Sequence, residues 1–156
     1  MWKILLLAAG VAVGFVAVVV SIANSRFDRA VDGQIRDMLS NAEDPERIVT
    51  ESELIELPEP VRRWLRSAGV VGRRTPSTIR LRQEGTLRLA PGGRWMEFAA
   101  DQYYTIDPTA FIWRVSLKML PGFFIRGVDQ FQHARGTMRM KPLALFNAVD
   151  ASGTAL

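Results

Sequence analysis

The chain contains no cysteine and only one histidine, His133, among its 156 residues. The absence of cysteine excludes disulfides, thiolate nucleophiles, thiolate metal ligands and a lipid-modified cysteine, although it does not identify the redox compartment. A histidine-based zinc site or a Ser-His-Asp triad would have to be built around His133 alone. The sequence therefore offers little material for the common catalytic and metal-binding chemistries.

No constellation of the remaining polar residues indicates catalysis or a metal centre. Ser116 falls inside an expected strand and lacks the flanking glycines of a nucleophile elbow. Asp101, Asp107 and Asp129 do not have metal-ligand spacing. His133 lies near a strand end, where an exposed loop histidine is the simpler interpretation. We expect no catalytic residue, no metal and no cofactor.

Lysine is also scarce, because the basic residues are 17 arginines and 3 lysines. The charge is segregated: Asp28 to Glu59 contains ten acids and three arginines, whereas Arg62 to Arg94 contains nine arginines and one acid. A basic segment can bind nucleic acid, anionic lipid or phosphate, but a solvated sheet face is the simpler interpretation. No nucleic-acid recognition motif is present, so we expect no nucleic acid as a partner.

One long uncharged run, residues 4–23, dominates the N-terminus. As a helix it spans about 30 Å, which is the hydrocarbon thickness of a bilayer. The alternative is a cleaved signal peptide, with Lys3 as a short positive region and Ser21-Ile22-Ala23 as a small-x-small cleavage site. The run is longer than the apolar region of about 7–15 residues usual in signal peptides. This length favours an uncleaved single-pass anchor.

The orientation of the anchor has two interpretations. Lys3 precedes the span, whereas Arg26, Arg29 and Arg36 come after it, and this count places the body in the cytoplasm by the positive-inside rule. A signal-like N-terminus, however, normally directs export of the rest of the chain. We expect a single-pass protein of the bacterial inner (cytoplasmic) membrane with an extracytoplasmic body.

Gly10 and Gly14 form a G-x-x-x-G pattern within the span. This spacing puts both glycines on one helix face, where a second helix can approach closely. Chance in a Gly/Ala/Val-rich span is the simpler explanation. The pattern nevertheless predicts helix packing in the membrane and makes a homo-oligomer one expected partner.

The organisation of the chain divides it into three regions. Residues 1–25 are the expected transmembrane anchor, and residues 26–49 are a juxtamembrane helix with an acidic linker. Residues 50–156 are expected to form a helix plus an antiparallel β domain. In the juxtamembrane helix the apolar residues share one face, which we expect to lie on the membrane surface: Phe27, Val31, Ile35, Met38 and Leu39.

Two short helical signals open the third region. Residues 50–53, Thr-Glu-Ser-Glu, have the form of a capping box. Pro60 suits a first helical turn and Gly69 suits the position after a helix end, so we expect a helix over residues 60–68. Its apolar stripe should face a core, while its arginines face water or the headgroups of anionic lipid.

After Pro76 the apolar period changes from helical to two, which predicts strands. The expected strands cover residues 79–89, 95–105, 111–119, 123–133, 135–141 and 143–149, and residues 150–153 are expected to form a hairpin turn. Consecutive short strands joined by turns imply a meander. The expected fold is therefore an N-terminal transmembrane helix followed by an α+β, mainly antiparallel β domain, in which a curved meander sheet has a short helix before it.

Several segments between about Glu53 and Gly153 resemble those of an uncharacterised bacterial family of membrane-associated proteins known only as a domain of unknown function. These segments are LPEPVRRWLRSAG, LRQEGTLR, WMEFAADQ, FIWRV, GVDQF and GTMRM. The resemblance implies further C-terminal strands and transfers no activity. It also implies that this chain corresponds to the N-terminal half of the family, with Thr154-Ala-Leu156 at the start of a new strand. We therefore expect an incomplete sheet.

Four residues are the expected ligand-binding positions on the apolar face of the sheet. Gln83, Gln102 and Asp129 are polar groups that strand parity places among apolar side chains. Trp113 shares this face, although a core position is the simpler interpretation of a tryptophan. Buried polar groups need partners, so the alternatives are an internal network, a register shift at Gly127 that turns Asp129 outward, or a ligand pocket. In a pocket, Gly85 and Gly127 would leave room for the ligand.

The leading functional hypothesis is a membrane-anchored, non-enzymatic domain that binds a lipid-like or other apolar ligand. Its expected partners are the membrane, anionic lipid or an apolar ligand, and a second copy of the chain. One alternative is a protein-interaction or structural subunit that pairs through an open sheet edge. A hydrolase with its chemistry in a missing C-terminal half is the least favoured alternative.

Overall fold

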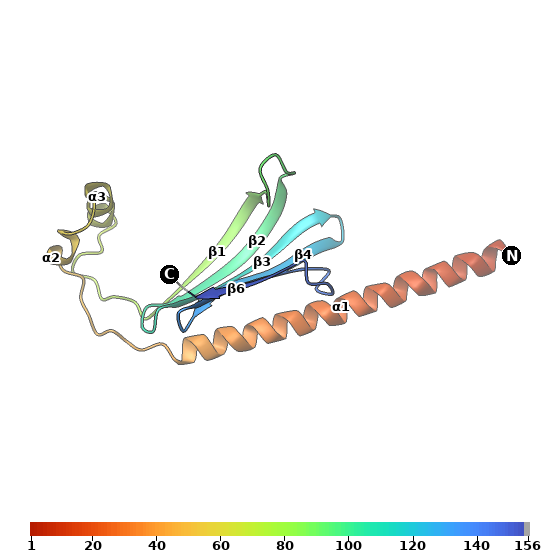
Figure 1. Cartoon of the computed structure of the whole chain (residues 1–156), viewed down its shortest axis with the longest axis horizontal. Helices are drawn as coiled ribbons and strands as arrows, with labels where there is room; N and C mark the ends of the chain where they lie inside the picture. The colour runs from red at the N-terminus through yellow and green to blue at the C-terminus, as the bar shows by residue number, and fades with distance from the viewer. Residues whose placement is uncertain (155–156) are drawn as a thin grey trace.

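A computed structural model describes residues 1–154 and shows one long helix, two short helices and a six-stranded sheet (Figure 1). The helices are α1 (Trp2–Ser40), α2 (Glu51–Leu54) and α3 (Glu59–Ser67). The strands are β1 (Thr78–Leu87), β2 (Met96–Thr105), β3 (Ala110–Leu120), β4 (Phe123–Gln132), β5 (Arg135–Pro142) and β6 (Val149–Thr154). The sequence predicts that a new strand begins at residues 154–156, but Ala155 and Leu156 lie outside the described residues.

The sheet is an antiparallel meander in which each strand pairs with the next in the sequence, in the order β1-β2-β3-β4-β5-β6. Within residues 1–154 the sheet is not closed, because β1 and β6 are its two edges. The predicted fold class, an apolar N-terminal helix followed by a mainly antiparallel domain, is confirmed. The period of two was a reliable signal because one face of nearly every strand is apolar.

The helix α1 runs without a break across the predicted boundary between residues 25 and 26. It is long and apolar enough to cross a membrane, and its most apolar part is not buried by any other part of residues 1–154. This composition fits a membrane anchor or a signal sequence. The C-terminal third of the same helix carries Val31, Ile35 and Met38, which are buried.

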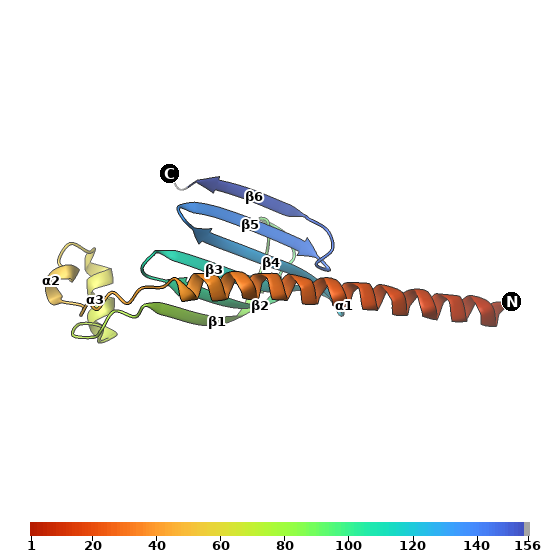
Figure 2. The same ribbon diagram turned by 90° about the horizontal axis from the view of Figure 1, so that it is seen from below.

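The sheet, rather than a membrane surface, covers the apolar face of residues 27–39, which corrects the expected position of the juxtamembrane helix. Val31, Ile35 and Met38 form one core cluster with Ala110, Ile112 and Val128 of β3 and β4. Figure 2 shows α1 lying across one face of the sheet. Burial of apolar side chains on both elements therefore fixes this part of α1 to the sheet.

α1 covers the polar face of the sheet, which sequence parity assigns to solvent. Residues such as Arg114 and Arg126 point toward α1 from this face, between the apolar contacts. The apolar face points away from α1, on the inside of the bend that β1 and β2 describe in Figure 1. Among residues 1–154, buried apolar side chains form two small clusters, one under α1 and one within the apolar face of the sheet.

The helix predicted at residues 60–68 is present as α3, but its apolar stripe does not face a core. Trp64 is 67% exposed and Val61 is 41% exposed, and no α3 residue is buried. α3 lies beyond the end of the sheet that is far from the N-terminus (Figure 1). The predicted capping box precedes it in α2, where the N–H of Thr50 donates to Glu53 Oε2 at 2.7 Å.

The last predicted strand is wrong, because residues 143–148 form a connection and the predicted hairpin turn at 150–153 belongs to β6. Leu143 and Ala144 have positive φ values of 52° and 59°. The N–H of Leu145 donates to Pro142 O at 3.0 Å, which closes a turn directly after β5. The apolar side chains of this segment resemble the pattern of a buried strand, because a turn can also be built from apolar residues.

Candidate functional site

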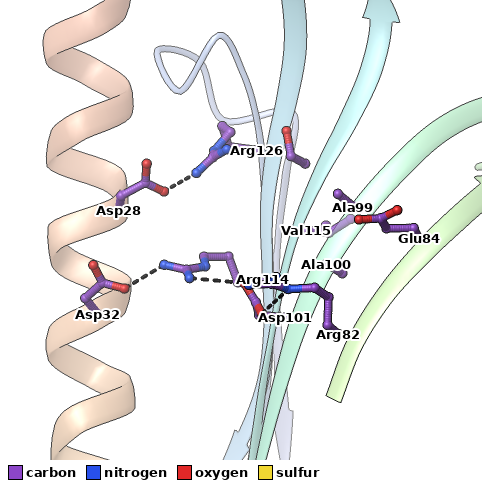
Figure 3. A pocket seen from close by; sticks show the side chains of 11 residues that line it. Asp28, Asp32, Arg82, Glu84, Ala99, Ala100, Asp101, Arg114, Val115 and Arg126 are labelled. Atoms are coloured by element: carbon purple, nitrogen blue, oxygen red, sulfur yellow. Dashed lines mark hydrogen bonds and ion pairs between the residues drawn. The ribbon is translucent and has the colours of Figure 1, made fainter. Parts of the chain in front are cut away.

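A charged cleft of about 490 Å³ lies between α1 and the polar face of the sheet (Figure 3). Asp28 and Asp32 enter it from successive turns of α1, which places both carboxylates on one helix face. Arg114 of β3, Arg126 of β4 and Asp101 of β2 enter it from the sheet. Acids of the helix therefore face arginines of the strands.

Two ion pairs join the helix to the sheet in this cleft. Arg114 Nη1 donates to Asp32 Oδ1 at 2.6 Å, and Arg126 Nη2 pairs with Asp28 Oδ1. The guanidinium of Arg126 also lies 5.7 Å from the ring centroid of Phe27, within cation–π range. Together with the apolar cluster, these pairs fix both the position and the rotation of α1 on the sheet.

Asp101 extends the network across the sheet. Its carboxylate accepts from Arg80 Nη2 at 3.1 Å and lies 3.5 Å from Arg114 Nη2. Burial is the largest single influence and raises the pKa of Asp101, but the combined hydrogen bonds and charges of Arg80 and Arg114 outweigh it and lower the pKa. Asp101 is therefore ionised in the folded protein at neutral pH.

The ion pairs of the cleft connect α1 to the sheet, and we call the residues Asp28, Asp32, Arg114 and Arg126 the latch. Ser116 lines the cleft, but His133 lines a different hollow, next to Gln34 and Asp37 near the far end of the sheet. Within residues 1–154 no group of three or more His, Asp or Glu side chains is placed to hold a metal ion. The arrangement neutralises charge between two elements and offers no activated nucleophile.

The four predicted ligand-binding residues lie together on the apolar face. Gln102, Trp113 and Asp129 are direct neighbours in register across β2, β3 and β4. Trp113 Nε1 donates to Gln83 Oε1 at 2.8 Å, which connects β3 to β1 across the intervening strand. The structure thus places these residues on one face, and part of the internal network that strand parity suggested is present.

Asp129 keeps its place on this face, because β4 pairs with β3 and β5 without a register shift at Gly127. Its carboxyl group has no hydrogen-bonded side-chain partner within residues 1–154, and it is half-buried. Burial raises the pKa of Asp129, and a backbone hydrogen bond from Gln130 opposes this effect only in part. The net effect on the Asp129 carboxyl group is a raised pKa, which favours its protonated form.

Side chains fill the space at the two glycines that were expected to make room for a ligand. A Cβ added to Gly127 would collide with Met140 Sδ and would lie 2.8 Å from Val115 Cγ1. A Cβ added to Gly85 would lie 3.3 Å from Phe98 Cε1. Gly127 is buried and forms part of the core, whereas Gly85 is exposed and lines a hollow of about 360 Å³ together with Phe98.

The apolar face is nevertheless exposed toward its edges. Its centre is buried within the sheet by contacts among Ala100, Val115, Leu117, Ile125 and Met140. Around this centre, exposed fractions of 37–42% are found for Ile79, Leu81, Met138 and Val149. No helix among residues 1–154 covers this face, since α1 lies on the other one and α3 lies beyond the sheet (Figures 1 and 2).

Sequence reasoning missed the latch between α1 and the sheet. The sequence pattern singles out none of Asp28, Asp32, Arg114 and Arg126, because parity assigns a residue to a face but does not say what covers that face. The spacing of Asp28 and Asp32, one helical turn apart beside an apolar stripe, was the available signal.

Gly10 and Gly14 lie on the exposed part of α1, and among residues 1–154 no neighbouring atom lies within 4 Å of a Cβ added to either glycine.

Comparison with known proteins gives one match. The model of a family of unknown function, DUF6544, matches residues 47–156, which contain α2, α3 and the sheet. Searches of curated proteins and of solved structures gave no match.

Proposed function

The chain belongs to this family of unknown function, and we propose that it is a membrane-anchored, non-enzymatic domain that holds a lipid-like ligand against the apolar face of its sheet. The observation that carries the proposal is the position of α1. The helix packs on the polar face of the sheet and leaves the apolar face uncovered within residues 1–154. Large exposed apolar surfaces are typical of interaction sites.

The anchor is the part of α1 that does not contact the sheet. A continuous helix joins the apolar run to the part of α1 that packs on β3 and β4. Because helical hydrogen bonding satisfies the backbone, such a segment is stable in a bilayer. Retention of the full-length chain in membranes after an alkaline wash tests this anchoring, and a mature chain that begins at Asn24 would contradict it.

The expected occupant is an acyl chain, because exposed apolar side chains continue to the end of the sheet that carries the β1–β2 and β3–β4 turns. This end of the sheet lies nearer the N-terminus (Figure 1). Leu89 and Trp95 flank the β1–β2 turn at this end, and Leu120 precedes the β3–β4 turn. These three side chains are exposed by 56–60%. An acyl chain leaving a bilayer at this end would meet apolar side chains along its path.

A binding assay on the full-length chain tests the ligand. The delipidated protein in an amphipathic polymer is titrated with a dansyl-labelled fatty acid, and energy transfer from tryptophan is recorded. We expect saturable binding that Leu81→Lys weakens about tenfold, which corresponds to about 1.4 kcal/mol. Leu81 is 42% exposed on an edge strand, so the lysine can be solvated without unfolding the sheet.

Ile55→Lys is the matched control, because Ile55 is 62% exposed and lies in the helical region beyond the sheet. We expect this variant to bind the probe as the unchanged protein does. Absence of saturable binding, or equal loss in both variants, would reject the apolar face as a ligand site.

The body is proposed to be extracytoplasmic in the bacterial inner membrane. Protease added to spheroplasts should then remove the body while a cytoplasmic marker remains intact. Protection of the body until the membrane is lysed would place it in the cytoplasm instead.

A protein-interaction subunit is the second candidate. β1 pairs only with β2 within residues 1–154, and eight of its ten residues are exposed. An exposed strand edge offers unpaired backbone groups to a second chain. Dimerisation that depends on protein concentration and needs no ligand, measured by analytical ultracentrifugation, would favour this candidate over the acyl-chain site.

A further inference from the structure

A second cleft, of about 460 Å³, lies between α1 and the connection from β5 to β6. Its walls are mostly apolar, with Val19 and Ile22 from the long uncharged run and Leu145 from the connection. It lies on the side of the sheet that α1 covers, so it is separate from the apolar face discussed above. It is also distinct from the charged cleft, because none of the latch residues lines it.

Among residues 1–154, three cations and no acidic side chain line this second cleft. Arg26 extends from α1, and Arg139 and Lys141 extend from β5. Within residues 1–154 none of the three makes an ion pair, although Asp150 is the strand neighbour of Arg139. The nearby acid Asp28 is already paired with Arg126. The cleft therefore combines uncompensated positive charge with apolar walls.

The cleft lies where the apolar run of α1 ends. Ala23 is the last residue of that run and lines the cleft, and Arg26 is the first charged residue after it. In a membrane-spanning helix this transition coincides with the headgroup region of the bilayer. With α1 anchored as proposed, the three cations would lie at the depth of the lipid phosphates, and Val19 and Ile22 would lie at the depth of the acyl chains.

The loops at this end of the sheet have the character expected beside a bilayer. The β5–β6 connection exposes Phe146 by 66% and Leu145 by 41%. Trp95, on the β1–β2 turn at the same end, lies under the guanidinium of Arg88 at 5.1 Å. Aromatic and basic side chains together are typical of the membrane interface. At the opposite end the β4–β5 turn consists of His133 and Ala134.

We propose that this cleft binds an anionic phospholipid, with the headgroup phosphate between Arg26, Arg139 and Lys141 and the acyl chain against Val19, Ile22 and Leu145. Basic side chains close to an anionic membrane surface each add favourable electrostatic energy, and a shaped cleft makes their contribution selective for one lipid position. The bound lipid connects β5 to the membrane-spanning part of α1. This proposal rests on the proposed anchoring but not on the apolar-face ligand.

The test compares lipids on the full-length chain. The protein, first shown to remain in washed membranes, is extracted into mild detergent with equal amounts of phosphatidylglycerol and phosphatidylcholine. Native mass spectrometry then measures the fraction of protein that carries each lipid. We expect at least a fivefold preference for phosphatidylglycerol, which the triple variant Arg26→Gln, Arg139→Gln, Lys141→Gln reduces to less than twofold.

A charge-matched triple variant separates the site from bulk charge. Arg63→Gln, Arg73→Gln and Arg135→Gln remove the same number of positive charges from exposed residues outside the cleft. We expect this variant to keep the preference for phosphatidylglycerol. Equal loss in both triple variants, or no preference in the unchanged protein, would overturn the proposal.

The source of the phosphate is tested with soluble competitors. Inorganic phosphate and glycerol phosphate at millimolar concentration should leave the phosphatidylglycerol adduct in place, because they lack the acyl chain that contacts Val19 and Ile22. Displacement of the lipid by either competitor would show a soluble phosphate site and would overturn the lipid assignment. Failure of the protein to remain in washed membranes is a separate result that contradicts the anchoring itself.

Discussion

Asp101 and Asp129 are both carboxylates on strands, but their surroundings shift their pKa values in opposite directions. Asp101 pairs with three arginines on the polar face, whereas Asp129 is half-buried on the apolar face and has no charged partner among residues 1–154. Burial raises the pKa of both carboxyl groups, but only the polar face supplies arginines that stabilise the ionised form. This contrast makes the pH dependence of stability specific to each residue.

Asp129→Asn should stabilise the protein at neutral pH. Because burial raises the pKa of Asp129 in the folded state, stability falls as the pH rises through the interval between the ordinary and the raised pKa. The amide removes this loss. In chemical denaturation we expect the gain to be present at about pH 7 and to disappear at a pH below the ordinary value of about 4. A gain of equal size at both pH values would contradict the assigned cause.

Asp101→Asn should have the opposite effect. The lowered pKa of Asp101 means that its carboxylate contributes stability above the ordinary pKa, and this contribution is lost as the pH falls through the lowered value. We expect a loss of roughly 1–2 kcal/mol at neutral pH, and a smaller difference from the unchanged protein in acid. An unchanged free energy of unfolding at neutral pH would show that the arginines find other partners.

Gly127→Ala should destabilise the sheet by roughly 1–3 kcal/mol, because the new Cβ would overlap Met140 and Val115. Gly153→Ala is the control, since nothing lies within 4 Å of a Cβ at that position of β6. We expect the control to change the free energy of unfolding by less than about 0.5 kcal/mol. Urea denaturation of both variants measures the difference, and equal effects would show that the core near Met140 can rearrange.

At the scale of elements, α1 has two environments along one continuous helix. Its first part is apolar and exposed, while residues 27–39 combine an apolar stripe with the acids of the latch. Apolar burial provides most of the attachment to the sheet, and the ion pairs set the rotation of the helix about its axis. The two parts lead to separate predictions.

The double variant Asp28→Asn, Asp32→Asn should loosen the C-terminal part of α1. Loss of both partners leaves Arg114 and Arg126, which are 19% and 21% exposed, without the helix carboxylates. We expect amide hydrogen exchange in residues 27–39 to become several-fold faster. Asp37→Asn is the control on the same helix, because Asp37 is exposed and makes no ion pair within residues 1–154. Equal exchange in both variants would argue against a latch.

Gly10→Ile should lower self-association of the apolar part of α1. The β-branched side chain would prevent the close approach that Gly10 and Gly14 allow between two helices. A membrane reporter of helix association measures the effect, with Val11→Ile as the control on a neighbouring face. An unchanged signal for Gly10→Ile would remove the G-x-x-x-G hypothesis.

The sequence predicts the strands better than it predicts the position of α1, because alternation reports the local geometry of a strand but not the contacts between elements. Alternation identified five strands to within two residues at each end and placed Gln83, Trp113 and Asp129 on one face. It did not show that α1 covers the opposite face, because that choice depends on pairing Asp28 and Asp32 with strand arginines far along the chain. The turn at residues 143–148 was missed because Leu145 and Phe146 are apolar and lie in a segment without glycine.

At the scale of the whole molecule, the sheet has one end that is near the apolar part of α1 and another that is far from it (Figure 1). The β1–β2 turn with Trp95 lies at the near end, whereas Trp64 lies on α3 beyond the far end. This arrangement does not favour the expected contact of α3 with headgroups, which stays an untested prediction. It favours contact between the near end of the sheet and the bilayer.

Single-tryptophan proteins in vesicles with brominated lipid test this orientation. We expect strong quenching of Trp95 fluorescence and no more than weak quenching of Trp64, because quenching requires close approach to the brominated acyl chains. Replacement of the other tryptophans by phenylalanine keeps most of the apolar packing. Equal quenching of Trp64 and Trp95 would contradict the orientation in which α1 crosses the bilayer.

The unbroken course of α1 from the apolar run to the sheet also has a mechanical consequence. A continuous helix is stiff, so the sheet that packs on its C-terminal part changes its orientation when the helix tilts. Membrane-spanning helices tilt when bilayer thickness changes. Under the proposed anchoring, a thinner bilayer should therefore incline the sheet and bring one side of its near end closer to the lipid surface, which would couple membrane thickness to the accessibility of both proposed sites.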